Sequence, residues 1–151
     1  MRIPLPFTPV PVTLQTLFVL SSGAVLGPFW GLTSQLLYLL LGIMGCPYFA
    51  GWQKGILTLL GPTGGYLLGF PFASFIAGLI AGRGELKRMY LGMLLGNILI
   101  YLFGSLWLGS VLSLSFKQAL IKGVLPFIPG DILKIAAGGI FVKSLSRWLK
   151  G

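Results

Sequence analysis

The chain has 151 residues, of which 56% are hydrophobic and 9% are charged, and its formal net charge is +9. Soluble domains carry about 25% charged residues, so this composition excludes a soluble fold and predicts an all-α integral membrane protein with a single domain, residues 1–151. Such a net charge alone could point to a nucleic acid, but no basic stripe with interleaved aromatic residues is present. We therefore expect the positive charges to meet the lipid bilayer and no nucleic acid.

Five apolar segments predict a polytopic bundle of five transmembrane helices, because a membrane-spanning helix needs about 17–25 mostly apolar residues. The chain begins with prolines at positions 4, 6, 9 and 11, which predict an extended stretch. Residues 48–62 predict an interfacial loop with Trp52 at the lipid headgroups, and residues 113–124 predict a short amphipathic helix. The predicted spans are residues 13–29, 32–45, 64–81, 89–111 and 128–145.

The orientation follows from the basic loop at residues 82–88, because cytoplasmic loops carry an excess of lysine and arginine. With this loop inside, five spans put the N-terminus outside and the C-terminus inside. The basic residues between 143 and 150 agree with this orientation, whereas Lys117 and Lys122 fall outside and disagree. An N-terminus outside the membrane is unusual when no helix before it directs insertion. We therefore expect a further helix to precede residue 1 in the complete protein.

Asp131 and Lys134 are the only charged residues between Gly123 and Val142, and they are one helical turn apart in the last predicted span. Charge inside a membrane is costly, so this pair predicts a site for a small polar ligand or ion. The alternative is structural. In that interpretation the two groups neutralise each other at the start of a helix, where a carboxylate also suits the helix dipole.

Further polar side chains lie in the predicted spans or at their ends, where apolar residues would be less costly. They predict either hydrogen bonds between helices or contacts to a ligand. Asn97 and Tyr101 share one helical face because they are four residues apart. The candidates are Gln15, Gln35, Tyr38, Thr63, Tyr66, Asn97 and Tyr101.

Catalytic and metal chemistry have little basis in this sequence. The chain has no histidine, and its one cysteine, Cys46, excludes a disulfide framework or a cysteine cluster. No nucleophile can therefore be paired with a histidine base. We predict that the protein is not an enzyme, has no metal site and needs no cofactor.

Five stretches, in order along the chain, are long and distinctive. They are IPLPFTPVPVTLQT at 3–16, TSQLLYLLLG at 33–42, GPTGGYLLGFP at 61–71, GNILIYLFGSLWL at 96–108 and LPFIPGDILK at 125–134. Together they resemble the BioY family, the biotin-binding S components of energy-coupling-factor (ECF) transporters. The resemblance implies a bundle of six transmembrane helices in a bacterial-type cell membrane that captures biotin from outside. It also implies a membrane-embedded T component and two ATPase subunits, which drive release of biotin inside.

The chain departs from the family pattern at two places. Family members usually have a helix before the IPLPFTPVP segment, and in S components this helix carries small residues that dock the T component. The sequence printed here begins at that segment, which agrees with the expectation of a preceding helix. Residues 45–54 replace part of the family's glycine-rich run with Trp52, Gln53 and Lys54.

Biotin has a neutral ureido ring with two N–H donors and a carbonyl, an apolar thioether ring and a carboxylate tail. Its pocket therefore needs an acceptor, donors, aromatic walls and a cation. Under this resemblance Asp131 is the acceptor, Asn97 and Tyr101 are the donors, Tyr66 is the aromatic wall and Lys134 is the cation. Gln15 and Thr63 complete the site. Which residue meets the ureido ring and which the carboxylate stays open at this point.

Three other functions remain open from the sequence. The first is an S component for another vitamin, and the second is an ion-coupled secondary transporter with Asp131 as its relay. The third is a structural membrane subunit that binds no biotin. The chain has no glycine-rich phosphate loop, so an ATP-driven process would need a partner that supplies the energy.

Overall fold

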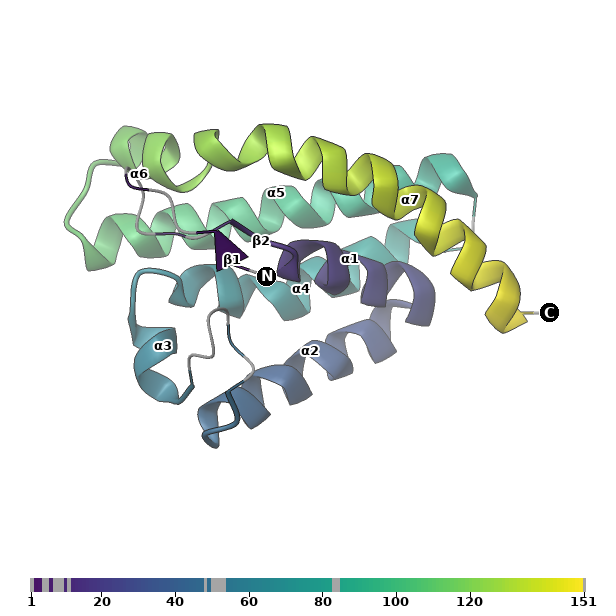
Figure 1. The fold of residues 1–151 in the computed structure, drawn as a ribbon, viewed down its shortest axis with the longest axis horizontal. Helices are drawn as coiled ribbons and strands as arrows, with labels where there is room; N and C mark the ends of the chain where they lie inside the picture. The colour runs from purple at the N-terminus through teal and green to yellow at the C-terminus, as the bar shows by residue number, and fades with distance from the viewer. Residues whose placement is uncertain are drawn as a thin grey trace.

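The structure, a computed structural model, describes residues 2–3, 6, 10, 12–47, 49, 54–82 and 85–150. These residues form an all-helical bundle with one small pair of strands (Figure 1). The elements are β1 Arg2–Ile3, β2 Val12–Thr13, α1 Gln15–Leu26, α2 Pro28–Ile43, α3 Ile56–Leu60, α4 Gly64–Ala81, α5 Leu86–Val111, α6 Phe116–Gly123, the 3-10 turn η1 Leu125–Phe127 and α7 Ile128–Lys150.

Three helical stretches of the described chain are long and apolar enough to cross a membrane. They are α4, α5 and the run Phe116–Leu145, which contains α6, η1 and most of α7. The predicted spans 64–81, 89–111 and 128–145 are therefore found as helices, with α5 beginning three residues earlier than predicted and α7 continuing to Lys150. The predicted amphipathic helix is α6, whose Ser115 closes a capping box with Gln118.

The first two predicted spans are also apolar helices, but α1 has 12 residues where 17 are predicted, and α2 has 16 where 14 are predicted. At 1.5 Å per residue α1 is about 18 Å long. The cause is Gly27, whose φ of 90° ends α1 in a backbone conformation that favours glycine. Pro28 then begins α2 at once, because proline is well tolerated at the first position of a helix. The sequence had placed this second helix four residues later.

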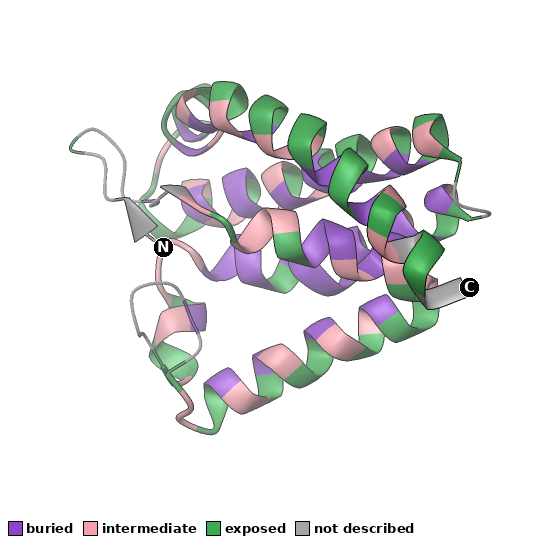
Figure 2. Cartoon of the chain, turned by 45° about the vertical axis from the view of Figure 1, so that its right-hand side comes forward, coloured by how far each residue is buried: buried purple, intermediate pink, exposed green. Residues whose placement is uncertain are grey.

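Helix α4 is the centre of the bundle, with buried residues along almost its whole length (Figure 2). Small residues let α1 and α2 approach it closely, as expected where lipid offers no hydrophobic drive for association. A Cβ atom on Gly23 of α1 would meet the backbone oxygen of Ser74 in α4. A Cβ on Gly31 of α2 would meet the Gly23 Cα and the Ser74 side chain. The three backbones therefore meet at one point.

Hydrogen bonds between side chains join the same three helices. The Ser22 and Ser74 hydroxyl oxygens are 3.1 Å apart, and the Gln35 Nε2 donates to the Ser22 oxygen at 3.0 Å. Polar side chains buried between membrane helices are commonly paired in this way. Gln35, one of the predicted polar candidates, thus serves helix association.

The N-terminal stretch and the connection before α4 hold more structure than predicted. Strand β1 pairs antiparallel with β2, with Arg2 opposite Thr13, where the sequence predicted only an extended segment. The predicted loop 48–62 contains α3. The predicted interfacial Trp52 lies outside the described residues, as does Arg83 of the predicted cytoplasmic loop.

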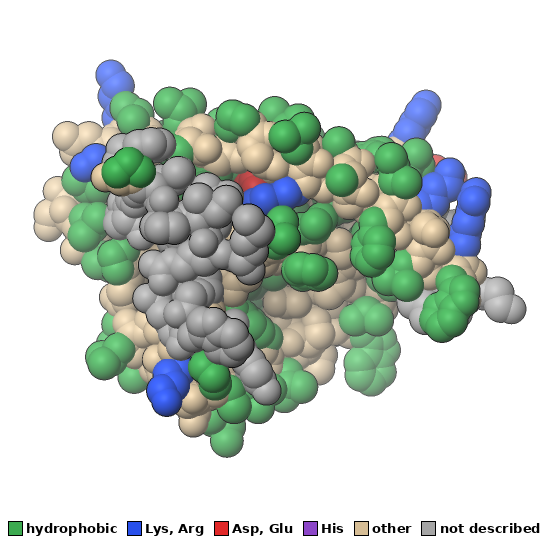
Figure 3. Space-filling view, viewed as in Figure 1, with side chains coloured by type: hydrophobic (Ala, Val, Ile, Leu, Met, Phe, Trp, Pro, Cys, Tyr) green, Lys and Arg blue, Asp and Glu red, His purple; other side chains and the backbone are tan. Residues whose placement is uncertain are grey.

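Basic side chains gather at the two ends of the molecule (Figure 3). Lys54, Lys117 and Lys122 belong to the connection before α3 and to α6, at the end where α4 and α7 begin. Lys87 belongs to the start of α5, at the opposite end, where α7 finishes. Between them, on the face drawn in Figure 3, one acidic side chain lies beside a basic one.

We expect Gly23→Ala to destabilise the protein, although alanine favours helix more than glycine by about 0.5–1 kcal/mol. The added methyl group meets the Ser74 backbone, and overpacking of this kind costs about 1–3 kcal/mol. The measurement is the temperature at which detergent-solubilised protein loses its monodisperse peak. The matched control is Gly130→Ala, because nothing lies within 4 Å of a Cβ there. Equal stability of the two variants would contradict this account of the helix junction.

Candidate ligand-binding site

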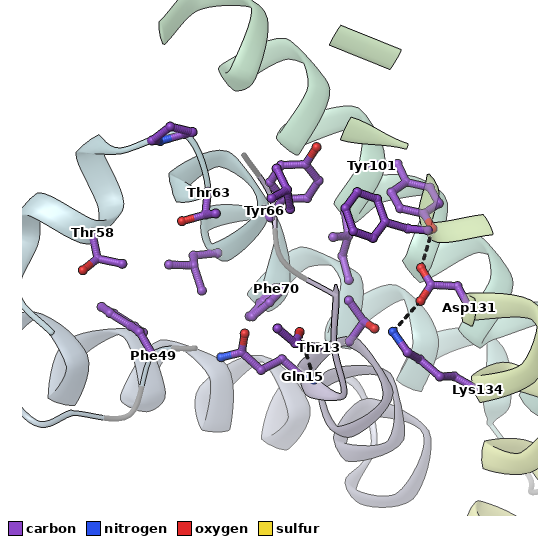
Figure 4. A pocket seen from close by; sticks show the side chains of 16 residues that line it. Thr13, Gln15, Phe49, Thr58, Thr63, Tyr66, Phe70, Tyr101, Asp131 and Lys134 are labelled. Atoms are coloured by element: carbon purple, nitrogen blue, oxygen red, sulfur yellow. Dashed lines mark hydrogen bonds and ion pairs between the residues drawn. The ribbon is translucent and has the colours of Figure 1, made fainter. Parts of the chain in front are cut away.

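A cavity of about 150 Å³ lies at the end of the bundle where α1, α4 and α7 begin. Its wall is mostly apolar and aromatic, with a few hydroxyl, amide and charged groups (Figure 4). Ligand sites usually have this combination. The lining residues are Val10, Thr13, Gln15, Thr16, Phe49, Thr58, Pro62, Thr63, Tyr66, Leu67, Phe70, Ile100, Tyr101, Phe127, Asp131 and Lys134.

Asp131 is the most completely bonded side chain of this wall, and it is only 5% exposed. The Lys134 Nζ donates to its Oδ1 at 2.7 Å. The Tyr101 hydroxyl and the Asn97 Nδ2 both donate to its Oδ2, the latter at 3.2 Å. A buried carboxylate is tolerated when it is paired and hydrogen-bonded, and here both oxygens have partners.

Helical spacing explains how the sequence assembles this group. Asp131 lies in the first turn of α7, where the helix dipole favours a negative charge. Lys134 follows one turn later on the same face. On the neighbouring α5, Asn97 and Tyr101 are four residues apart and present both donors to the same oxygen. The predicted shared face of Asn97 and Tyr101 is therefore confirmed.

The predicted candidates fall into two groups by position. Asp131, Lys134, Tyr101, Tyr66, Gln15 and Thr63 line the cavity, whereas Asn97 lies behind Asp131 and is absent from the lining. The Tyr66 hydroxyl donates to the Gly123 carbonyl at 2.7 Å, so its ring rather than its hydroxyl faces the cavity. The Gln15 Nε2 donates to the hydroxyl of Tyr38, which lies on α2.

Sequence reasoning missed several residues of the wall. Phe49 and Thr58 come from the connection between α2 and α4, and no periodic pattern marks them. Phe70 and Phe127 lie in apolar runs where a core role is the default interpretation. Thr16 also lines the cavity, and its Oγ1 is buried with no hydrogen-bond partner among the described residues. The only feature of the sequence that could have marked Thr16 as part of the wall is its position next to the predicted site residue Gln15.

The charged pair and the Tyr101 hydroxyl lie on a different side of the cavity from Thr58 and Thr63. Figure 4 shows Asp131 and Lys134 on one side, Thr58 and Phe49 on the other, and aromatic rings between them. No group of three or more metal-ligating side chains occurs in the described part of the chain. The arrangement suits a small ligand with a polar head, an apolar middle and a second polar end.

The BioY family model matches residues 1–151. The chain belongs to the BioY family. The resemblance predicted from the sequence is thereby confirmed, and membership in a family of transport proteins agrees with the prediction that the chain is not an enzyme.

Relatives of this BioY-family chain cover most of its length. A probable biotin transporter BioY of Pyrococcus horikoshii is 50% identical over 137 residues, 91% of this chain and 81% of the relative. The biotin transporter BioY of Thermotoga maritima is 36% identical over 146 residues, 96% of this chain and 86% of the relative. The crystal structure of the S-component for biotin from an ECF-type ABC transporter matches with a TM-score of 0.88 at 30% identity. It covers 97% of this chain and 80% of that one.

We expect Lys134→Met to destabilise the fold strongly, because it leaves the buried Asp131 carboxylate without its cation. Breaking one side of a buried pair typically costs about 3–5 kcal/mol, whereas replacing both charges is far less harmful. The double variant Asp131→Asn, Lys134→Met should therefore recover most of the loss in a double-mutant cycle measured by thermal unfolding in detergent. Lys117→Met, at an exposed position of α6, is the control. Additive losses in the cycle would show that the two groups do not stabilise each other.

Proposed function

We propose that this protein is the biotin-capturing S component of an ECF-type transporter and that biotin binds in the cavity at the start of α1, α4 and α7. The observation that carries the proposal is the Asp131–Lys134 pair in the wall of that cavity. Membership in the BioY family and the likeness to an S-component for biotin support the choice of ligand. In this proposal Asp131, Lys134, Tyr101, Tyr66, Gln15 and Thr63 contact the ligand, and Asn97 holds Asp131.

The charged pair suits the ureido ring better than the carboxylate tail. The Lys134 ammonium is 2.7 Å from the Asp131 carboxylate, so the pair is nearly neutral as a unit. It presents an acceptor beside a donor, which complements the adjacent N–H and carbonyl of a urea. An incoming carboxylate would meet the negative charge of Asp131 and lose much of its attraction to Lys134.

The placement of the other parts of biotin then follows from the shape of the cavity. The rings of Tyr66 and Phe70 lie between the pair and the opposite side, where they form a wall for the apolar thioether ring. The carboxylate tail points to the side where Thr58, Thr63 and Gln15 offer hydroxyl and amide donors. Hydrogen bonds to such groups hold a carboxylate without a cation.

We further propose that all five long or apolar helices lie in the cell membrane, so that the chain crosses it five times. Phe18 of α1 and Trp30 of α2 are 63% and 72% exposed, which suits side chains that face lipid. The cavity end faces outside and the end with Lys87 and Arg147 faces the cytoplasm, where basic residues are favoured. The cavity then opens toward the side from which a vitamin arrives.

The partners in this proposal are a membrane-embedded T component and two ATPase subunits. The chain has no glycine-rich phosphate loop, so ATP must be hydrolysed by other subunits. The likeness to a subunit of an ECF-type ABC transporter supports this division of labour.

Asp131→Asn should weaken biotin binding by roughly 10- to 150-fold, because a hydrogen bond to a charged group contributes about 1.5–3 kcal/mol. If the pair meets the ureido ring, biotin and biotin methyl ester should lose affinity by the same factor. The measurement is isothermal titration of purified protein with both compounds. Lys122→Gln, at an exposed position of α6, should bind both as the parent does.

If the Asp131→Asn variant binds biotin as tightly as the parent protein, the Asp131–Lys134 pair has a structural role and does not contact the ligand. A loss confined to free biotin would instead reverse the proposed orientation. Titration with a panel of other vitamins tests the ligand itself, and tight binding of a different vitamin with no binding of biotin would contradict the proposal.

Uptake of labelled biotin by cells that express this chain should require the T component and both ATPases. It should persist when a protonophore collapses the ion gradient while cellular ATP is held constant. Uptake that disappears under the protonophore would favour the ion-coupled alternative with Asp131 as relay. An ATPase variant unable to hydrolyse ATP is the control, and it should abolish uptake.

A further inference from the structure

Helix α2 contacts the wall of the ligand cavity from behind. The structure describes every residue of α2, and none of them is among the residues that line the cavity. One face of this helix points into the bundle and carries Gly31, Gln35, Tyr38 and Gly42, which are spaced by four, three and four residues. Gly31 and Gln35 meet α1 and α4. Tyr38 and Gly42 are nearer the cavity end and contact residues of its wall.

Three residues of the wall, each from a different part of the chain, contact Tyr38. The Gln15 Nε2, at the start of α1, donates to the Tyr38 hydroxyl oxygen. The ring of Phe49 packs edge-on against the Tyr38 ring with the centroids 5.6 Å apart, and the ring of Phe70 on α4 lies at 6.4 Å. Gln15, Phe49 and Phe70 all line the cavity.

The position of the Tyr38 hydroxyl is fixed by this packing. Phe49 and Phe70 contact the ring, and the ring of Phe49 is itself held one turn further along α2, where a Cβ on Gly42 would overlap it. The backbone of the connection is also bonded to this helix, since the Gly55 N–H donates to the Gly42 carbonyl at 2.7 Å. A hydroxyl on so well packed a ring is a fixed partner for a flexible side chain.

Gln15 is the flexible side chain that benefits. Glutamine has many rotamers, and ordering such a side chain when a ligand binds lowers the affinity. The bond to Tyr38 orders the Gln15 amide before any ligand arrives. Its NH2 group has two hydrogens, so it can donate to Tyr38 and to a ligand at once. Figure 4 shows the Gln15 side chain extending away from Lys134, toward the side of Phe49 and Thr58.

We infer that Tyr38 is a positioning residue for ligand binding, which holds the Gln15 amide ready to donate to the carboxylate tail of the ligand. The inference rests on the proposed function, in which Gln15 lies at the tail end of biotin. Tyr38 itself does not line the cavity and acts only through Gln15. Helix α2 thereby sets the affinity for the tail from outside the cavity, while the Asp131–Lys134 pair binds the other end.

The test is isothermal titration of the purified full chain with biotin and with a biotin analogue whose tail ends in a methyl group. Tyr38→Phe removes the hydroxyl and keeps the ring with its contacts to Phe49 and Phe70. We expect it to weaken biotin by roughly 2- to 10-fold, the range set by ordering one long side chain. Binding of the analogue should stay unchanged, because its tail has no polar group for Gln15 to meet.

The matched control is Tyr90→Phe. It also removes a hydroxyl that joins two helices, since the Tyr90 hydroxyl donates to the Ala136 carbonyl at 3.0 Å, but Tyr90 does not line the cavity. This variant should bind both ligands as the parent does. A general loosening of the bundle would weaken both ligands together, so the difference between the ligands separates positioning from a merely structural role.

A double-mutant cycle tests whether Tyr38 acts through Gln15. Gln15→Met removes the amide at similar length, and it should weaken biotin and spare the analogue. In that background Tyr38→Phe should cost nothing more. The inference is overturned if Tyr38→Phe leaves biotin unchanged, weakens both ligands by the same factor, or keeps its full effect beside Gln15→Met. Failure of the parent protein to bind biotin would contradict the proposed function itself, and this inference with it.

Discussion

The Asp131 carboxylate is the group around which the polar part of this protein is organised. It is buried in a chain with few charges, and an unpaired carboxylate there would cost several kcal/mol. Lys134, Tyr101 and Asn97 together satisfy its two oxygens and thereby fix α5 against the first turn of α7. The side of the cavity that carries this group is therefore rigid before any ligand arrives, which lowers the entropy cost of binding.

Close packing of helix backbones fixes the position of the helix that carries the donors to Asp131. Gly23, Gly31 and Ser74 bring α1, α2 and α4 to one point, so α4 is held in the middle of the bundle. Its other side receives α5, where a Cβ on Gly96 would meet the Ala73 carbonyl. In a membrane such contacts replace the hydrophobic effect as the source of helix association. The position of α5, and with it the donors to Asp131, depends on these small residues.

The sequence predicted the parts of the site that rest on local spacing. Asp131 and Lys134 stand out because the surrounding segments are apolar, and Asn97 with Tyr101 follows from the helical repeat. The wall contributed by Phe49 and Thr58 was not predictable, because it depends on how the connection before α4 folds back over the cavity. The early start of α2 was also missed, because a proline usually indicates the end of a helix. Here Pro28 is instead the first residue of α2, a position where proline is well tolerated.

Tyr66 has a consequence for how this protein can change in evolution. Its ring lies where a side chain on Gly104 would lie, and its hydroxyl oxygen lies where one on Gly123 would lie. The same hydroxyl donates to the Gly123 carbonyl, 57 residues away in the chain. A mutation at either glycine would displace a wall of the cavity without touching any ligand. We therefore expect a substitution at Gly104 or Gly123 to be tolerated better when residue 66 is smaller. The shape of the cavity thus depends on Gly104 and Gly123, although neither of them lines it.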